Sequence, residues 1–263
     1  MVAASMLKRR TEREPPPGAL PALDRARDAL FLDIDGTIVD IAPTPEAVCV
    51  PESLKRNLSR LNAFLDGAVA LVSGRTLASV DALFAPVELS AVGCHGAEIR
   101  RRPESKIESR GEPLSTPIKA AFADIAKLDA RIRLEDKHFT FAIHYRRAPE
   151  LENQLFGLVN ERLAALDANL EVICGKAVIE IKEPGFNKGT GLMDLMSQAP
   201  FRGRHPVYFG DDSTDEDAFA VLAGLKGLGI SVGRMLPGAA SCVFSPADVR
   251  DWLARCVEGG EPT

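Results

Sequence analysis

The sequence predicts an α/β fold in which a parallel sheet is interrupted by an inserted α+β unit. Short apolar runs alternate with helical patterns near both ends of the chain, as they do in a parallel sheet. Between these parts lies a segment in which apolar and polar residues alternate, which indicates antiparallel strands. The length of 263 residues suits one large domain, or one domain that carries a smaller insertion.

The first part of the expected sheet contains three strands and two helices. Residues 29–32 form an apolar run that ends in acidic residues, as a buried strand does. Leucines at helical spacing predict a helix within 51–65. Residues 68–72 and 89–92 predict two further strands, separated by a second short helix.

The middle of the chain has a different pattern. Aromatic and aliphatic residues alternate with other residues over 139–145, which predicts a strand with one buried face. A helical pattern spans 151–166, and 178–181 reads as another strand. We therefore expect an inserted α+β domain, which we predict to be a cap, at about 107–183.

The α/β pattern returns after this insertion. Residues 207–209 and 227–232 predict strands, and 215–222 predict a helix. Residues before the first strand are charged, rich in Pro and Ala, and without periodicity, which is typical of a flexible tail. The expected organisation is a tail at 1–26, a core at 27–106 and 184–258, and the inserted domain at 107–183.

Composition limits the classes of partner. The net charge of −5 argues against nucleic-acid binding, although it allows an anionic small substrate at a site with a metal ion and a few basic side chains. The five cysteines are scattered and form no C-x-x-C pair, which fits a reducing cytoplasm. We find neither a secretory signal nor an apolar run long enough to span a membrane. We therefore expect a soluble cytoplasmic protein without nucleic-acid or membrane partners.

An acidic motif, Asp-Ile-Asp-Gly-Thr at residues 33–37, directly follows the first strand. Side chains two residues apart on a strand point the same way, so Asp33 and Asp35 are expected on one side of its carboxyl end. Ligands bind at that edge of open parallel sheets, and a divalent cation offsets the repulsion between two carboxylates. The alternative is that Gly36 simply marks a turn after a strand.

A second acidic motif, at residues 210–217, follows the strand at 207–209 and has five acidic residues within seven positions. Helix capping by Ser213 or Thr214, with acids in the first turn, is the alternative to a metal site. Capping explains Asp211 and Asp212 poorly, because they come directly after a strand. We favour a magnesium site.

Two weaker signals could serve a phosphate group. Ser73 ends the second strand, where its hydroxyl and neighbouring backbone N–H groups could hold a phosphate oxygen. Lys188 precedes a helix and could neutralise charge on that phosphate. Taken singly, a Ser-Gly turn and a solvated lysine are the simpler interpretations.

These four motifs, in this order, resemble those of phosphatases in the haloacid dehalogenase superfamily. A further series, at 93–98, 135–137, 144–146 and 175–180, is similar to the trehalose-6-phosphate phosphatase family. The resemblance covers about residues 27–258. It implies a Rossmann-like core with an α+β cap between the Ser and Lys motifs.

The resemblance also implies a magnesium-dependent hydrolysis of trehalose 6-phosphate, in trehalose biosynthesis. Asp33 would attack phosphorus and form an aspartyl-phosphate, and Asp35 would serve as acid and then base. Mg²⁺ would be held by Asp33, the backbone carbonyl of Asp35, and Asp211. Of the remaining motif residues, Ser73 and Lys188 would clamp the phosphate. Asp212 and Asp215 would lie nearby, where they bind metal waters or orient Lys188.

The residues implied for substrate binding come from both parts of the chain. For the cap residues, the alternative is a solvated sheet face with cross-strand ion pairs, and His95 could equally be a structural histidine. Rival functions are a phosphatase for another sugar phosphate, such as sucrose phosphate or a mannosyl phosphate, and a catalytically silent sugar-binding regulator. The implied substrate-binding residues are Thr37, Arg75, His95, Gly96, Glu135, Lys137, Arg146, Lys176 and Glu180.

Overall fold

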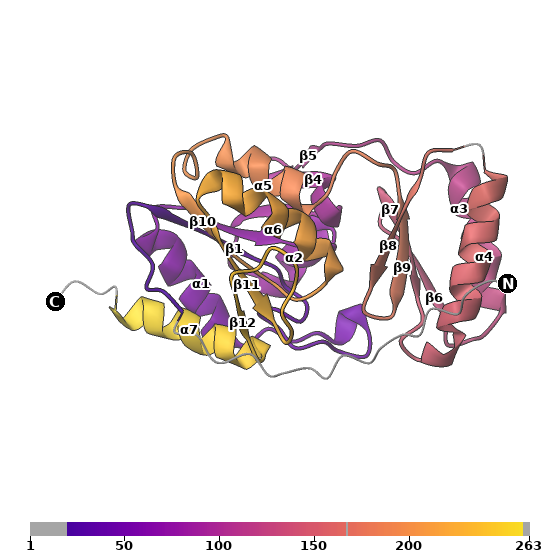
Figure 1. Cartoon of the computed structure of the whole chain (residues 1–263), viewed down its shortest axis with the longest axis horizontal. Coiled ribbons are helices and arrows are strands. Elements are labelled where there is room, and N and C mark those ends of the chain that lie inside the picture. The colour runs from indigo at the N-terminus through magenta and orange to yellow at the C-terminus, as the bar shows by residue number, and fades with distance from the viewer. Residues whose placement is uncertain (1–19, 167, 260–263) are drawn as a thin grey trace, which may run out of the picture.

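The computed structural model describes residues 20–166 and 168–259. Within these residues the chain forms an eight-stranded and a four-stranded sheet, which lie side by side in an elongated molecule (Figure 1). We call them the large sheet and the small sheet. The parallel-sheet α/β prediction is confirmed by the large sheet.

Eight strands of the described chain form the large sheet. They are β1 (Asp28–Leu32), β2 (Val69–Val72), β3 (Ser90–Gly93), β4 (Glu98–Arg100), β5 (Glu108–Ser109), β10 (His205–Gly210), β11 (Leu228–Val232) and β12 (Ser241–Val243). Their order is β12-β11-β10-β1-β2-β3-β4-β5, and only the contacts of β4 are antiparallel. Because the chain proceeds outward from β1 in one direction and later in the other, the strand order reverses beside β1. Such a reversal is where open α/β sheets bind ligands.

Helices cover both faces of the large sheet. They are α1 (Glu52–Phe64), α2 (Leu77–Phe84), α5 (Lys188–Met196), α6 (Glu216–Leu222) and α7 (Pro246–Gly259). Helices α5 and α6 pack together on one face, and α1 and α7 on the other (Figure 1). The leucines of α1 are its buried residues, each worth about 1.5–3 kcal/mol of burial. None of the helices in the described ranges is long and apolar enough to cross a membrane.

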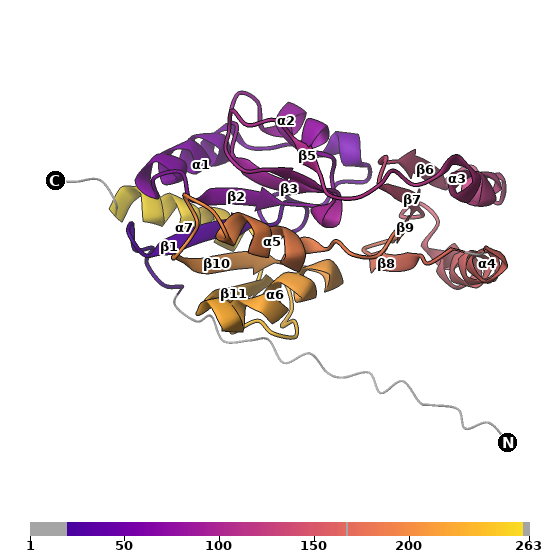
Figure 2. The ribbon, with the colours of Figure 1, turned by 90° about the horizontal axis from the view of Figure 1, so that it is seen from above.

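The small sheet has the order β6-β7-β9-β8 and is antiparallel throughout. Its strands are β6 (Arg133–Asp136), β7 (Thr140–His144), β8 (Glu171–Gly175) and β9 (Val178–Lys182), and its helices are α3 (Thr116–Phe122) and α4 (Glu152–Ala165). Both helices lie on the side away from the large sheet (Figure 2). We call the described residues within 114–182 the small unit, and the rest the large unit.

The two faces of the small sheet differ in chemistry. Phe141, Ile143 and Ile181 pack against the helices, which confirms the apolar face expected from the alternation. The opposite face is also buried at Thr140 and Glu180, because it faces the large unit instead of solvent. The expectation of a single buried face is therefore wrong. Alternation predicts which residues share a face, but it does not say what covers that face.

Short 3₁₀ helices complete the connections. They are η1 (Pro45–Ala47), η2 (Cys94–Gly96), η3 (Ala123–Lys127), η4 (Pro149–Leu151), η5 (Ser213–Asp215) and η6 (Ala223–Leu225). The chain leaves the large sheet after β5, at Ser109, so pairing of β5 with β4 extends that sheet slightly beyond residue 107. It returns between β9 and α5.

The end of the predicted tail packs on the large unit. Residues 1–19 lie outside the described residues. Leu20 and Leu23 contact the main hydrophobic core, and the indole N–H of Trp252 donates to the Pro21 carbonyl at 3.0 Å. The flexible-tail prediction is therefore wrong for residues 20–26. Two partly buried leucines and one backbone hydrogen bond thus hold a segment that lacks any periodicity.

Candidate active site

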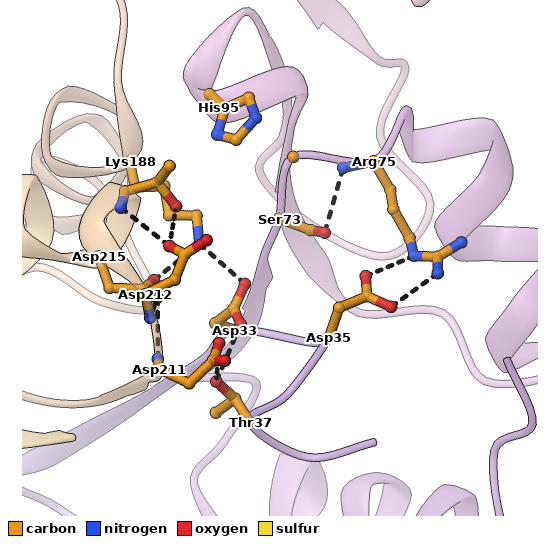
Figure 3. A network of polar contacts seen from close by, with 12 residues as sticks. Asp33, Asp35, Thr37, Ser73, Arg75, His95, Lys188, Asp211, Asp212 and Asp215 are labelled. Carbon is orange, nitrogen blue, oxygen red and sulfur yellow. Dashed lines mark hydrogen bonds and ion pairs between the residues drawn. The ribbon is translucent and has the colours of Figure 1, made fainter. Parts of the chain in front are cut away.

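Four elements bring polar side chains to the carboxyl edge of the large sheet. Asp33 follows β1, Ser73 follows β2, Asp211 follows β10, and Lys188 begins α5. These side chains converge although their elements are far apart in sequence (Figure 3). A cavity of about 260 Å³ lies here and is lined by residues of both units.

Lys188 lies between two buried carboxylates. Its Nζ donates to Asp33 Oδ1 at 2.9 Å and to Asp215 Oδ1 at 2.7 Å. Burial alone would lower the pKa of Lys188, but Asp215 and Asp33 outweigh it and raise the pKa well above its usual value. The ammonium group is fixed where α5 begins, because Asn187 caps this helix by accepting from the Thr190 N–H at 2.8 Å.

Asp215 connects Lys188 to the rest of the second acidic motif. It also accepts from the Tyr208 hydroxyl at 2.6 Å, and its Oδ2 accepts from the backbone N–H groups of Asp211 at 2.9 Å and Asp212 at 3.1 Å. A fully buried carboxylate with this many donors has no conformational freedom. Asp215 therefore holds both Lys188 and the loop that carries Asp211.

Helix capping and the acidic site share the second motif. Asp212 is the N-cap of η5, and its Oδ1 accepts from the Thr214 backbone N–H at 2.8 Å and hydroxyl at 2.6 Å. The capping alternative named Ser213 or Thr214, and that assignment is wrong because both lie inside the turn. Capping thus accounts for Asp212 and leaves Asp211 for another role.

The donor set fits a hard divalent cation. Oxygen atoms of Asp33, Asp211 and Asp215 all lie within 4.8 Å of one another. The Thr37 hydroxyl is 2.9 Å from Asp33 Oδ2 and 3.2 Å from Asp211 Oδ1. Burial, reinforced by neighbouring carboxylates, raises the pKa of Asp33 and of Asp211. Burial therefore makes these charged carboxylates costly without a cation beside them, and carboxylate oxygens are the ligands that Mg²⁺ prefers.

Gly36 allows the first motif to approach Asp211. Its φ is +89°, and a Cβ added there would lie 2.2 Å from Asp211 Oδ2. We expect Gly36→Ala to lower the free energy of unfolding by about 1–2 kcal/mol through backbone strain, and also to weaken Mg²⁺ binding. Calorimetric Mg²⁺ titration and thermal unfolding measure the two effects separately.

Gly203 supplies the control for this change. Its φ is +84°, but an added Cβ would meet nothing within 4 Å. Gly203→Ala should therefore show comparable strain and an unchanged Mg²⁺ affinity. Equal Mg²⁺ affinities for the two alanine variants would contradict a cation site at Asp211.

Asp35 and Asp33 turn toward different partners. Both oxygens of Asp35 accept from Arg75, at 2.6 Å from Nε and 2.7 Å from Nη2 (Figure 3). The strand ends at Leu32, so the strict two-residue alternation expected for the motif does not extend through it. Asp35 still lines the same cavity as Asp33.

Ser73 is held beneath the cavity. It is buried, and its Oγ accepts from the Arg75 backbone N–H at 3.1 Å. Since that oxygen accepts a bond, the hydroxyl proton remains available for donation to a ligand. Ser73 lines the cavity together with Lys188.

A buried ionic network connects the small unit to the large one. Lys137 Nζ donates to Glu180 Oε1 at 2.8 Å and to the Gly74 carbonyl at 3.1 Å, and Thr140 donates to Glu180 Oε2 at 3.1 Å. Burial would raise the pKa of Glu180, but Lys137 and His95 outweigh it and lower the pKa. His95 Nε2 lies 3.3 Å from Glu180 Oε2 without the alignment of a hydrogen bond.

Three further side chains of the small unit reach the large unit. Lys176 forms an ion pair with Asp211, and Arg146 donates to the Ala42 carbonyl and, at 3.0 Å, to the Lys176 carbonyl. Arg133 also pairs with Glu46, with both oxygens at 3.1 Å. These contacts connect the small unit both to the carboxylate of Asp211 and to the loop that contains Ala42 and Glu46.

The structure does not bring every proposed substrate-binding residue to the cavity wall. Thr37 is buried between carboxylates, and Gly96 (φ +110°) packs on the backbone of Asn187, where a Cβ would lie 2.4 Å from its oxygen. Neither lines the cavity, whereas Arg75, His95, Glu135, Lys137, Arg146, Lys176 and Glu180 do.

Several lining residues were missed by the sequence analysis. The loop around residues 41–48 directly follows the first acidic motif and therefore has to lie at the same sheet edge, which is a signal that could have identified it. The small unit adds Arg131, Arg133, His144 and Arg147. These side chains lie on two short strands or in the turns beside them, where no comparable signal exists.

Comparison with solved structures shows which proteins share this fold. The model resembles the C-terminal domain of the Candida albicans trehalose-6-phosphate phosphatase, with a TM-score of 0.79 at 22% identity over 92% of this chain and 99% of that one. It also resembles a Bacteroides thetaiotaomicron phosphatase of the haloacid dehalogenase superfamily, with a TM-score of 0.57 at 15% identity over 94% and 100%. These likenesses, at 22% and 15% identity, show a shared fold.

Comparison of sequences shows the family to which the chain belongs. A family model described as trehalose-phosphatase matches residues 31–240, so the chain belongs to the trehalose-phosphatase family. It is 36% identical to the trehalose-6-phosphate phosphatase of Escherichia coli K12, over 87% of this chain and 86% of that protein. It is 40% identical to a probable trehalose-phosphate phosphatase of Sinorhizobium fredii, over 80% of each.

Proposed function

We propose that this chain hydrolyses trehalose 6-phosphate to trehalose and phosphate, through an aspartyl-phosphate on Asp33. The observation that carries the proposal is the convergence of Asp33, Lys188 and Ser73 on one cavity, beside Asp211. Family membership and the name of the Escherichia coli relative support the substrate.

In the first step Asp33 attacks phosphorus in line with the departing sugar oxygen. A carboxylate oxygen forms the new O–P bond while the bond from phosphorus to the sugar oxygen breaks. Lys188 and Ser73 neutralise and orient the phosphoryl oxygens, since both side chains line the cavity beside Asp33. Asp35 gives its proton to the sugar oxygen, which leaves as a hydroxyl.

In the second step water cleaves the aspartyl-phosphate. Asp35, now a carboxylate, takes a proton from the water, whose oxygen attacks phosphorus and releases phosphate and the Asp33 carboxylate. Both Asp35 oxygens accept from Arg75 in this structure. Proton transfer therefore requires the Asp35 carboxyl group to exchange Arg75 for the substrate or the water.

The proposed cofactor is Mg²⁺, held by Asp33, Asp211 and the carbonyl of Asp35. When bound, it supplies positive charge that offsets the phosphate and the clustered carboxylates. Asp215 does not need to bind it directly, because all its oxygens already accept hydrogen bonds from protein donors. Lys176 pairs with Asp211 and so is the side chain that has to move to make room.

Removal of divalent ions should abolish phosphate release, and added Mg²⁺ should restore it. The reason is that a dianionic ester has to enter a site whose buried carboxylates are already costly to keep charged. Phosphate release after chelation, followed by titration with Mg²⁺, measures this. Full activity in the presence of excess chelator would contradict the proposal.

We propose that the small unit is a cap and that it recognises the sugar of the substrate. Its inner face presents Glu135, Lys137 and Glu180 to the cavity, so donors and acceptors alternate there. Sugar hydroxyls both donate and accept, and a site built for them rejects analogues that lack them.

Phosphate release measured across a panel tests the proposed substrate. Trehalose 6-phosphate should be hydrolysed with a higher kcat/KM than sucrose phosphate, mannosyl phosphates or glucose 6-phosphate. Preference for another member would overturn the substrate but leave the phosphatase. Binding of sugar phosphates without any phosphate release would instead indicate a silent regulator.

A further inference from the structure

Glu135 and His144 form a polar pair on the cavity wall of the small unit. Glu135 of β6 lies opposite Ala142 of β7, so His144 is two residues further along β7 and on the same face. His144 Nε2 and Glu135 Oε2 are 2.8 Å apart. Both side chains line the cavity.

The direction of this hydrogen bond follows from the carboxylate. Burial would raise the pKa of Glu135, but the hydrogen bond from His144 and the charge of Lys137 outweigh it and lower the pKa. An ionised carboxylate can only accept, so His144 Nε2 donates. Among the described residues, Oε1 of Glu135 accepts no hydrogen bond.

The charged neighbours of Glu135 already have partners. Lys137 is bonded to Glu180, and Arg75 is bonded to Asp35. His144 is thus the one described group that fixes the Glu135 carboxylate by a hydrogen bond. Without it, the charges of Lys137 and Arg75 would draw the carboxylate toward themselves.

We propose that His144 is a positioning residue, which holds Glu135 so that its second oxygen accepts a hydrogen bond from a sugar hydroxyl of the substrate. This inference rests on the proposed function, because it requires a hydroxyl-bearing phosphate ester in the cavity. It assigns to His144 a part in sugar recognition and none in phosphoryl transfer.

The test compares His144→Phe, which keeps a ring without a donor, with His144→Gln, which keeps an N–H donor. Loss of a hydrogen bond to a charged group predicts that His144→Phe lowers kcat/KM for trehalose 6-phosphate about 10-fold or more. His144→Gln should recover most of that loss. Turnover of p-nitrophenyl phosphate, which has no sugar hydroxyl, should be unchanged in both variants.

A double-mutant cycle with Glu135→Gln decides whether His144 acts through Glu135. Adding His144→Phe to Glu135→Gln should cause little further loss, since the carboxylate to be positioned is already gone. The inference would be overturned if the two losses of kcat/KM multiplied in the double variant. A parallel loss of turnover of p-nitrophenyl phosphate would overturn it as well. If the panel shows another preferred sugar phosphate, the same cycle on that substrate tests His144 independently of the substrate's identity.

Discussion

Replacing Asp33 by Asn should reduce turnover by about 10⁴-fold or more, the scale seen when a catalytic nucleophile is removed. The amide cannot form the aspartyl-phosphate, even with saturating Mg²⁺. The fold should tolerate the change, because burial already raises the pKa of Asp33 and makes its charged form costly. Lys188 also keeps its bond to Asp215. Steady-state phosphate release and thermal unfolding measure the two expectations.

Asp66→Asn is the matched control for this variant. Asp66 is half exposed, pairs with Arg25, and has a φ of 53° that Asn tolerates well. The same chemical change there should leave turnover intact. Unchanged turnover of Asp33→Asn would refute the mechanism. An equal loss of turnover in Asp66→Asn would also count against it, because the assay would then report folding.

Replacing Lys188 by Met should abolish turnover and also destabilise the protein by about 3–5 kcal/mol, the cost of leaving a buried ion pair with one partner. Asp33 and Asp215 are both buried and would lose their shared ammonium group. The raised pKa of Lys188 means that its stabilising effect is fully present below about 10.5 and is lost only as pH rises through the folded value. Denaturant unfolding at neutral pH measures this loss.

A double variant separates the charge effect from packing. In Asp33→Asn/Lys188→Met one of the two stranded carboxylates is neutral, so part of the lost stability should return. An additive or larger loss in the double variant would mean that Lys188 contributes through the packing of its methylene groups instead. Restoration of turnover is not expected, because the nucleophile is absent.

The convergence of the proposed catalytic residues could be predicted because each of them follows a strand or starts a helix. A strand ending in Asp or Ser places that side chain at a known edge of the sheet, whatever the rest of the chain does. The contact between Lys188 and Asp215 was implied by the resemblance alone, since strand and helix patterns do not say how α5 and α6 pack.

Elements at the sheet edges were harder to predict than central ones. Strands β4 and β5 are too short for any periodicity, and β6 and β8 lie at the edges of the small sheet. Helix α7 was missed although Val249, Trp252 and Leu253 have helical spacing and are buried. The spacing of these three residues is a signal that does predict this helix.

Contacts between the two units were the hardest feature to predict from the sequence. Arg133 and Glu46 are 87 residues apart, and Lys176 and Asp211 are 35 residues apart. Nothing in the local pattern of either residue specifies such a partner. Their pairing depends on the angle at which the two units meet. That angle depends on the two segments of chain that connect the units.

The split core also constrains the order in which the chain can assemble. Leu30 of β1 pairs with Val69 on one side and with Val207 on the other. On a ribosome, one edge of this central strand therefore stays bare until β10 has been made, whereas every strand of the small sheet is by then complete. Joining β10 to β1 closes a long loop whose entropy has to be lost late. The site is assembled in that same step, so a partly synthesised chain has no functional site.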